Sequence, residues 1–428
     1  MTSPLSAEAP GIDFDDLLSD VAVNHPSRFY GALRAHDPVY FNPRWNGWIV
    51  TRYDDVAAGF RAHEQLSSDR MAGPWGDDFA LSKQNLQEPG VRGDPGKVSL
   101  YEVLSKCFVW RDPPFHTRVR TLLNKAFIPR SIELLRPRAR RLVAELIEAL
   151  PAEQPIDFLH GFAFHLPVMV ICEYLGIPGE ARESVKHWSD DLSAVIFVRG
   201  HDLDRNRKAE EAARAMLDYV RSIVRERRSH PQDDLISAIL AAEDEHVTIT
   251  EDEIVANIVL MVFAGHETTM NLISNGIAAF GRHPDQWRRL QQKPNLVRHA
   301  VEEVLRTDGP LRATARWARE ALEIGGKEIA PNDRVLLVQI AANHDPAAFS
   351  DPDRFDIGRT GNRHVAFGHG IHTCLGAPLA RMESQEAFSY LSERFDRVEV
   401  LEEPPVYAAA IASGGFEELH VTFRERAR

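Results

Sequence analysis

One cysteine stands in a glycine-rich loop, within the stretch FGHGIHTCLG that runs from Phe367 to Gly376. A helical pattern, LGAPLARMESQEAFSYLSERF, follows Cys374 directly, so its sulfur stands at an expected helix start. Backbone N–H groups at such a start can hydrogen-bond a thiolate and keep it ionised. Gly368 and Gly370 allow tight turns and a close backbone approach to a flat ligand. The pattern predicts a ligating thiolate; the alternative is a structural thiol at a helix cap.

A lone thiolate is sufficient for one kind of metal centre. Haem iron takes four in-plane bonds from the porphyrin, so one axial cysteine completes the protein's share, and thiolate donation favours O–O cleavage. Structural zinc usually takes two or more thiolates or regular Cys/His pairs. His364, His369 and His372 lie close by, but their spacing is irregular and no second cysteine is near. The spacing therefore favours haem over zinc.

A long apolar segment precedes this loop in the chain. Thr250 and Glu253 form a capping box at its start, and Gly281 followed by Pro284 indicates its end. About thirty residues at ~1.5 Å per residue extend roughly 45 Å, enough to cross a whole domain. Because the segment is apolar on most sides, we expect a buried helix.

Polar residues interrupt the middle of this helix, in the stretch AGHETT. Polar groups inside a core helix are costly unless they have partners or a purpose. Ala264 and Gly265 are small enough to leave room for dioxygen. Thr268 would hydrogen-bond the oxygen or a nearby water, and Glu267 would supply the protons that O–O cleavage requires. The alternative is a distorted helix with satisfied polar groups.

Cations suited to carboxylates form a third group. Haem carries two propionates, and buried carboxylates need cationic or hydrogen-bonding partners. His116 and Arg120 lie at i,i+4 on one helix face, within DPPFHTRVR. Arg316 and His372 complete the predicted set, although each alone would indicate only a surface charge.

The stretch EEVLR places Glu303 and Arg306 at i,i+3 on a helix. If this pair is buried, Arg354 of DPDRF is the predicted second cation on Glu303, in a structural network. The alternative is an exposed helical pair.

Composition sets the class of protein. The 428 residues are 44% hydrophobic and 26% charged, as in soluble globular proteins, and a net charge of −13 argues against nonspecific nucleic-acid or anionic-membrane binding. Cys107, Cys172 and Cys374 are too few and too far apart for a disulfide framework, which suits a reducing compartment. The N-terminus shows no signal peptide pattern, and the longest apolar run, Ile258 to Gly265, is too short to span a bilayer. We expect a cytoplasmic protein.

Helical periodicity dominates the chain. Residues 130–150, 209–228 and 294–306 each repeat apolar residues every three to four positions. Strand patterns are fewer, at residues 48–53 and in a hairpin turning at Gly325-Gly326. No repeat or linker divides the sequence. Residues 1–428 are therefore predicted to form a single, mainly α domain with small β sheets.

Taken together, the motifs resemble the cytochrome P-450 superfamily. The cysteine loop is the most specific of them, and AGHETT, EEVLR, ANHDPAAFSDPDRF and DPPFHTRVR occur in the family's order and spacing. The resemblance covers nearly the whole chain and is weakest over the first thirty or so residues. It implies a triangular helical fold with haem b, iron protoporphyrin IX, between the long helix and the cysteine loop.

The resemblance also assigns roles to residues. Cys374 is the implied axial ligand of the iron, and Thr268 with Glu267 is the implied acid–alcohol pair. The implied structural triad is Glu303, Arg306 and Arg354. The positions implied to bind the cofactor are His116, Arg120, Ala264, Gly265, Arg316, Phe367, His372 and Cys374.

The function implied is that of a soluble, bacterial-type haem-thiolate monooxygenase. It would insert one oxygen atom from O₂ into a C–H bond of a medium-to-large apolar molecule, such as a steroid, terpenoid, fatty acid or polyketide. Oxidative coupling or desaturation by the same oxidant, and a non-catalytic haem sensor, remain alternatives. The expected substrate pocket draws on residues 71–109, 185–205, 311–315 and 410–415 and on the long helix near Asn257 and Met261.

Electrons would come from NAD(P)H through a separate ferredoxin and ferredoxin reductase. We expect these partners to dock on the cysteine side, where Arg111, Arg118 and Lys125 are candidate basic contacts.

Overall fold

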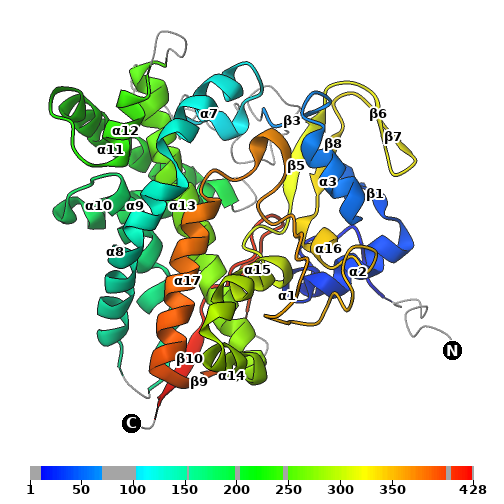
Figure 1. The fold of residues 1–428 in the computed structure, drawn as a ribbon. Coiled ribbons are helices and arrows are strands. Elements are labelled where there is room, and N and C mark those ends of the chain that lie inside the picture. The colour runs from blue at the N-terminus through cyan, green and yellow to red at the C-terminus, as the bar shows by residue number, and fades with distance from the viewer. Residues whose placement is uncertain are drawn as a thin grey trace.

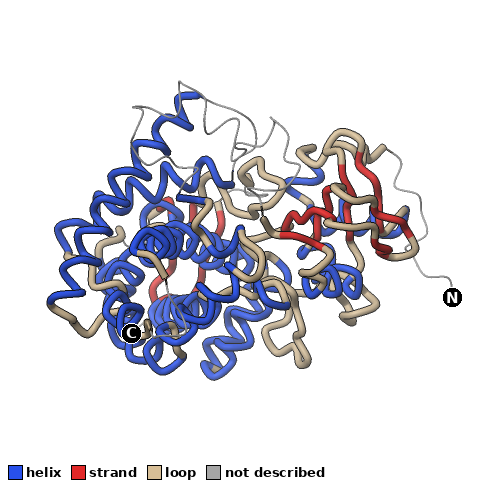
Figure 2. The backbone as a smooth tube through the Cα atoms, turned by 90° about the horizontal axis from the view of Figure 1, so that it is seen from above, coloured by secondary structure: helices blue, strands red, loops and turns tan. Residues whose placement is uncertain are grey.

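The computed structural model describes residues 11–69, 103–151, 154–197, 203–243, 249–401 and 406–426. Helices form most of this part of the chain (Figure 1). Seen from above, the largest group of strands lies at one side of the molecule, and the helices fill the other (Figure 2). The predicted mainly α fold with small β sheets is confirmed.

The helices alternate long spans with short connecting turns. Their bounds are α1 (Asp20–Asn24), α2 (Pro26–His36), α3 (Tyr53–Arg61), α7 (Phe115–Ala126), α8 (Pro129–Glu148), α9 (His165–Tyr174), α10 (Arg182–Phe197), α11 (Leu203–Ser229), α12 (Leu235–Ala241), α13 (Glu251–Arg282), α14 (Pro284–Gln292), α15 (Val297–Thr307), α16 (Gln339–Asn343) and α17 (Ala377–Arg394). Short single turns are η1 (Phe108–Trp110), η2 (Leu159–Ala163), η3 (Gly179–Ala181), η4 (Pro294–Leu296) and η5 (Gly370–His372).

The strands form three small sheets. Their bounds are β1 (Val39–Asn42), β2 (Gly47–Val50), β3 (Leu66–Ser67), β4 (Ile156–Asp157), β5 (Thr314–Ala318), β6 (Leu322–Ile324), β7 (Lys327–Ile329), β8 (Arg334–Leu337), β9 (Phe395–Val400) and β10 (His420–Glu425). One sheet has the order β1-β2-β8-β5-β3, with β2 and β8 parallel, and another has the order β4-β10-β9. The predicted hairpin is β6-β7, and its turn residues Gly325 and Gly326 have φ of 57° and 82°, a region that favours glycine.

The long helix α13 runs through the core, and in the part of the chain that the structure describes it contacts α9, α10, α11 and α17. Its predicted capping box is present, because the Glu253 N–H donates to Thr250 Oγ1 (3.2 Å) and the Thr250 N–H donates to Glu253 Oε2 (2.8 Å). Pro284 ends the run and begins α14, as expected. None of the described helices is long and apolar enough to cross a bilayer.

A buried charge cluster ties α15 to the loop before the cysteine. Glu303 and Arg306 are fully buried and pair through two hydrogen bonds of 2.9 and 3.0 Å. The second cation on Glu303 is Arg359, whose Nε lies 3.0 Å from Oε1. The prediction of Arg354 for this role is wrong. Its side chain is 64% exposed, and only its backbone carbonyl joins the cluster, by accepting a hydrogen bond from Arg306.

The cluster predicts unequal effects of two arginine substitutions. Arg359→Ala should lower the free energy of unfolding by about 3 kcal/mol, because a buried carboxylate loses a paired cation. Arg354→Ala, the matched control, should change it by less than about 0.5 kcal/mol, because that side chain faces solvent. Urea unfolding followed by circular dichroism measures both, and equal losses would contradict the assignment.

Candidate active site

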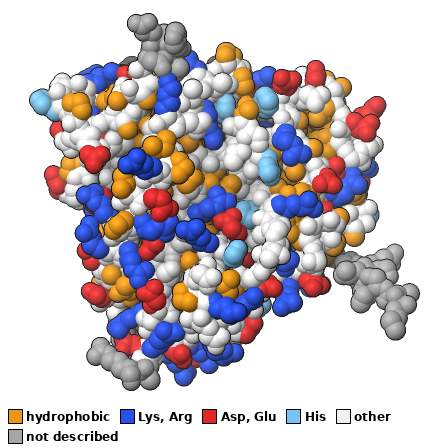
Figure 3. Space-filling model, in the orientation of Figure 1, with side chains coloured by type: hydrophobic (Ala, Val, Ile, Leu, Met, Phe, Trp, Pro, Cys, Tyr) orange, Lys and Arg blue, Asp and Glu red, His pale blue; other side chains and the backbone are white. Residues whose placement is uncertain are grey.

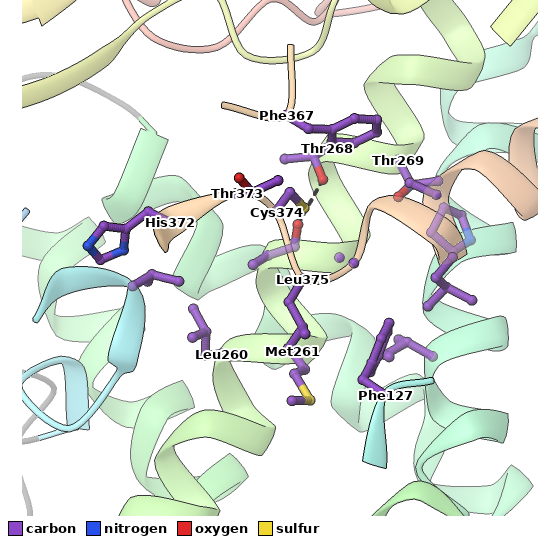
Figure 4. A pocket seen from close by; sticks show the side chains of 18 of the residues that line it. Phe127, Leu260, Met261, Thr268, Thr269, Phe367, His372, Thr373, Cys374 and Leu375 are labelled. Carbon is purple, nitrogen blue, oxygen red and sulfur yellow. Dashed lines mark hydrogen bonds between the residues drawn. The ribbon is translucent and has the colours of Figure 1, made fainter. Parts of the chain in front are cut away.

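A cavity lies between α13 and the loop that carries Cys374, with an empty volume of about 830 Å³ including open solvent (Figure 4). The described residues that line it are mostly apolar. From α13 they include Leu260, Met261, Ala264, Gly265, Thr268 and Thr269, and from the cysteine loop and α17 they include Phe367, His372, Cys374, Leu375 and Leu379. The sequence motifs that predicted one site therefore meet around one space.

The cysteine loop has a conformation that requires glycine. Gly368 and Gly370 have φ of 68° and 72°, and a Cβ on Gly370 would lie 2.7 Å from the Phe60 carbonyl oxygen. The Cys374 N–H donates to the Phe367 carbonyl at 2.9 Å, which closes the loop. As a result, the loop packs closely against α3 and turns the Cys374 side chain toward the cavity.

The Cys374 thiol is enclosed by protein yet accessible from the cavity, because the cavity admits a water-sized sphere to it. Burial raises the pKa of this thiol, while the backbone N–H groups of Gly376 and Ala377 and the charges of Arg120 and Arg381 lower it. The predicted N–H donors at the helix start are therefore present. With these donors and charges beside it, the thiol can ionise and bind a metal cation held in the cavity.

Two arginines and two histidines gather beside the sulfur. The rings of His116 and His372 lie 4.2 Å apart, and their buried nitrogens have no hydrogen-bond partner of ordinary geometry. Burial, followed by a neighbouring arginine charge, lowers the pKa of His116 to about 4 and that of His372 to about 2. Among the described residues Arg120 and Arg316 form no ion pair, and Arg316 donates a hydrogen bond to the Ala315 carbonyl. Burial lowers the pKa of Arg316 to about 10.

Buried cations without a counter-ion and ring nitrogens without a hydrogen-bond partner are costly, so this group fits a ligand that brings anions. A macrocycle with two carboxylates satisfies that need, and a flat shape suits the room beside α13. A Cβ on Gly265 would meet no atom within 4 Å, which shows how open the cavity is there. The residues present therefore fit haem.

The acid and the alcohol on α13 face different ways. The Thr268 hydroxyl donates to the Ala264 carbonyl at 2.8 Å, so toward the cavity it offers lone pairs as an acceptor (Figure 4). Glu267 is absent from the described cavity lining, and its Oε1 accepts a hydrogen bond of 3.5 Å from Ser413. Burial raises the pKa of Glu267 to about 7, opposed by the hydroxyls of Ser193 and Ser413. This carboxyl can therefore hold or release a proton near neutral pH.

The other predicted residues divide into two groups. His116 and Arg316 flank the cavity through their positions next to His372 and do not line it. Arg118 forms a bidentate pair with Glu253 at 2.6 and 3.1 Å, and Arg111 pairs with Asp69 at 3.2 Å. These two arginines thus have intramolecular partners instead of forming an unpaired basic patch.

The expected pocket segments are represented in part. Phe108, Val109 and Met261 line the cavity. Asn257 instead receives the Phe108 N–H at 3.0 Å and donates to the Lys106 carbonyl, so it holds η1 against α13. Residues 71–102 and 198–202 lie outside the described residues, and the described parts of the other segments do not reach this lining.

Sequence reasoning missed several lining residues. Phe127, Pro167 and Ile171 come from the end of α7 and from α9, and their apolar character made them look like ordinary core. Glu383 on α17 also lines the cavity, and burial raises its pKa well above the usual value. Because polar and apolar residues alternate irregularly along α17, its sequence gave no indication that Glu383 is buried.

Comparisons with known proteins agree with this geometry. A family model for Cytochrome P450 matches residues 83–407. Cytochrome P450 CYP107DY1 of Priestia megaterium is 36% identical over 391 residues, which is 90% of this chain and 92% of that protein. Vitamin D(3) 25-hydroxylase of Pseudonocardia autotrophica is 37% identical over 385 residues, which is 89% of each chain. The solved structure of the bacillaene polyketide synthase cytochrome P450 PksS of Bacillus subtilis has a TM-score of 0.83 at 30% identity, covering 97% of this chain and 100% of that one.

Glu267 predicts a specific dependence of stability on pH. Because its pKa rises from 4.5 to about 7 in the folded chain, the folded state binds more protons than the unfolded state between these values. Stability should therefore fall as pH rises through this window, by on the order of 2–3 kcal/mol more in the wild type than in Glu267→Gln.

Urea unfolding at about pH 4 and about pH 8 measures this difference, since the two values bracket the titration. Glu418→Gln, an exposed site, is the control and should follow the wild type. Parallel curves for the wild type and Glu267→Gln would contradict the burial of an ionisable Glu267.

Proposed function

The chain belongs to the cytochrome P450 family, and we propose that this monooxygenase inserts one oxygen atom from O₂ into a C–H bond of a medium-to-large apolar molecule. One observation carries the proposal. The cavity places the Cys374 thiol opposite a threonine of the facing helix, with two arginines and two histidines at or beside its lining and a neighbouring buried acid behind the threonine.

Haem is the cofactor that the family implies, and we propose haem b with Cys374 as its axial ligand. When bound, it would supply the iron on which O₂ is activated, with the thiolate favouring O–O cleavage. The N–H groups of Gly376 and Ala377 hold negative charge on the sulfur. Ala264 and Gly265 leave space on the opposite side. The residues proposed to hold the two propionates are His116, Arg120, Arg316 and His372.

Protons would reach the site through Glu267 and Thr268. With its pKa near 7, Glu267 carries a proton in a large fraction of molecules at neutral pH. The Thr268 hydroxyl donates its proton to the Ala264 carbonyl, so its oxygen can accept a hydrogen bond from a water in the cavity. Glu267 would thus donate the proton, and Thr268 would orient the water that carries it.

The substrate is proposed to be steroid-like or polyketide-like. The described cavity wall is mainly hydrocarbon, with Phe108, Leu260, Met261 and Ile171 among its members. Such a surface recognises apolar area and has few groups to orient a polar ligand. Two relatives whose names state vitamin D(3) 25-hydroxylation and polyketide synthesis support these classes.

We propose a separate ferredoxin and ferredoxin reductase as the electron source. The face that carries α7, α8 and α17 approaches the cysteine loop, and basic side chains are prominent on it among acidic ones (Figure 3). The proposed contacts are the exposed Lys125 at the end of α7 and, on α8, the exposed Arg130 with the 73% exposed Leu134. An apolar centre with a basic rim suits an acidic electron carrier.

Replacing the ligand tests the proposed centre. The reduced wild-type protein with carbon monoxide should show the long-wavelength Soret band of thiolate-ligated haem. Cys374→Ser should lose it, because a serine hydroxyl is a far weaker acid than a thiol and leaves no thiolate to bind the iron. Cys172→Ala, which alters a buried thiol elsewhere, is the control and should keep the band. A band that survives in Cys374→Ser would refute the assignment.

Ligand titration tests the substrate class. Steroids and macrolide lactones should shift the Soret band of the resting protein, because they displace water from the cavity, whereas sugars should leave it unchanged. Met261→Glu should weaken binding by more than about tenfold, because it places a charge in the apolar wall. Met261→Leu should stay within about threefold. A panel without any shift would argue against the proposed substrates.

A further inference from the structure

A hydrogen-bonded set of three charged or polar side chains lies on the outer side of the cysteine loop. Arg381 on α17 donates to both carboxylate oxygens of Glu302 on α15, at 2.7 and 2.8 Å. His364, in the loop, lies 3.0 Å from Glu302 Oε2 through its Nε2. Three separate segments therefore meet at one carboxylate.

The hydrogen bonds fix the state of each member. The Ala366 N–H donates to His364 Nδ1 at 3.2 Å, so the ring proton is on Nε2 and is donated to Glu302. Burial alone would raise the pKa of Glu302, but Arg381 and His364 hold it down to about 2. Glu302 is therefore anionic at neutral pH, and the guanidinium of Arg381 has one defined orientation.

That orientation places a positive charge next to the proposed ligand. The Arg381 guanidinium carbon lies 4.5 Å from the centre of the Phe367 ring, in a cation–π arrangement. Phe367 lines the cavity, and its carbonyl accepts the Cys374 N–H at 2.9 Å. Arg381 also favours the ionised form of the Cys374 thiol. The cation is therefore held against the residue that closes the cysteine loop.

We propose that Glu302 and His364 fix Arg381 over Phe367 as a permanent positive charge that raises the reduction potential of iron bound by Cys374. The inference rests on the proposed function, since it requires Cys374 to be the ligand. Reduction adds one negative charge to the centre, and a nearby cation stabilises the reduced form more than the oxidised one. Glu302 and His364 are positioning residues, because they act through Arg381.

Two features favour this role over a purely structural one. Arg381 and Glu302 are 34% and 26% exposed, and ion pairs at that exposure contribute little to stability. The bidentate geometry, fixed from a second side by His364, instead confers a single orientation, which a potential-setting charge requires. A freely moving surface arginine would be screened by solvent and salt.

Potentiometric titration of the haem-loaded protein, followed by absorbance, tests the proposal. At a fixed applied potential, Arg381→Gln should lower the ratio of reduced to oxidised iron on the order of tenfold, because one nearby positive charge is removed. Arg381→Lys keeps the charge without the planar fork and should lower the ratio by less than about threefold.

Arg394→Gln is the matched control. Arg394 lies at the far end of the same helix, is also ion-paired and is removed by the same substitution, with the same change in net charge. Thirteen residues at ~1.5 Å per residue put it roughly 20 Å further along the helix, so the ratio should match the wild type. An Arg381→Gln ratio equal to that of Arg394→Gln would overturn the proposal.

A double variant separates placement from net charge. Glu302→Gln with Arg381→Gln leaves the net charge unchanged and avoids an unpaired Glu302, so it also guards against misfolding. The ratio should still fall, by about threefold, because Arg381 is the member that contacts Phe367. A ratio equal to the wild type would refute the placement. If the wild type itself lacked the thiolate Soret band with carbon monoxide, the proposed function would fail; unchanged potentials with that band present would reject only this inference.

Discussion

A single sulfur facing an enclosed apolar space is the constraint on which the rest of the structure depends. Negative charge on Cys374 is unfavourable there unless donors and cations surround it, because burial opposes ionisation. The chain meets this need from two sides. The start of α17 supplies N–H groups, and Arg120 and Arg381 supply positive charge. The loop itself is held by α3, which packs so closely on it that position 370 leaves no room for a Cβ.

The facing helix must be long, buried and continuous to present small residues opposite that sulfur. The α13 residues that line the cavity are adjacent pairs spaced four apart, from Leu260 to Thr269, and they share one face of the helix; Glu267 lies just outside that face. This geometry explains why Thr268 lines the cavity while Glu267 contacts Ser413. The acid is thereby kept among protein atoms, which raise its pKa, and the alcohol remains on the cavity side of the helix.

Local patterns predicted the elements that carry their own signals, such as the capping box of α13 and the turn at Gly325-Gly326. They did not predict contacts that depend on the path of an irregular loop. Arg354 and Arg359 lie five residues apart in the loop after α16. Only the folded path of this loop determines that Arg359 contacts Glu303 while the Arg354 side chain faces solvent. The burial of Glu383 likewise depends on which face of α17 meets the cavity. The pattern of α17 in a single sequence does not show which of its faces meets the cavity.

Buried charges beside the cavity differ from those elsewhere in the described chain in lacking counter-ions. Elsewhere in the described chain, buried charges have been given partners, as Glu303 shows. Beside the cavity Asp112, the acid whose charge acts on Arg316, already accepts hydrogen bonds from the Ser68 N–H and from Arg319. Among the described residues Arg316 therefore has no counter-ion, only a hydrogen bond to the Ala315 carbonyl, and the proposed anionic ligand would supply one. Because such a ligand would bind only the folded arrangement, its binding free energy would add to the stability of the fold. The buried charges proposed to bind it oppose folding in its absence.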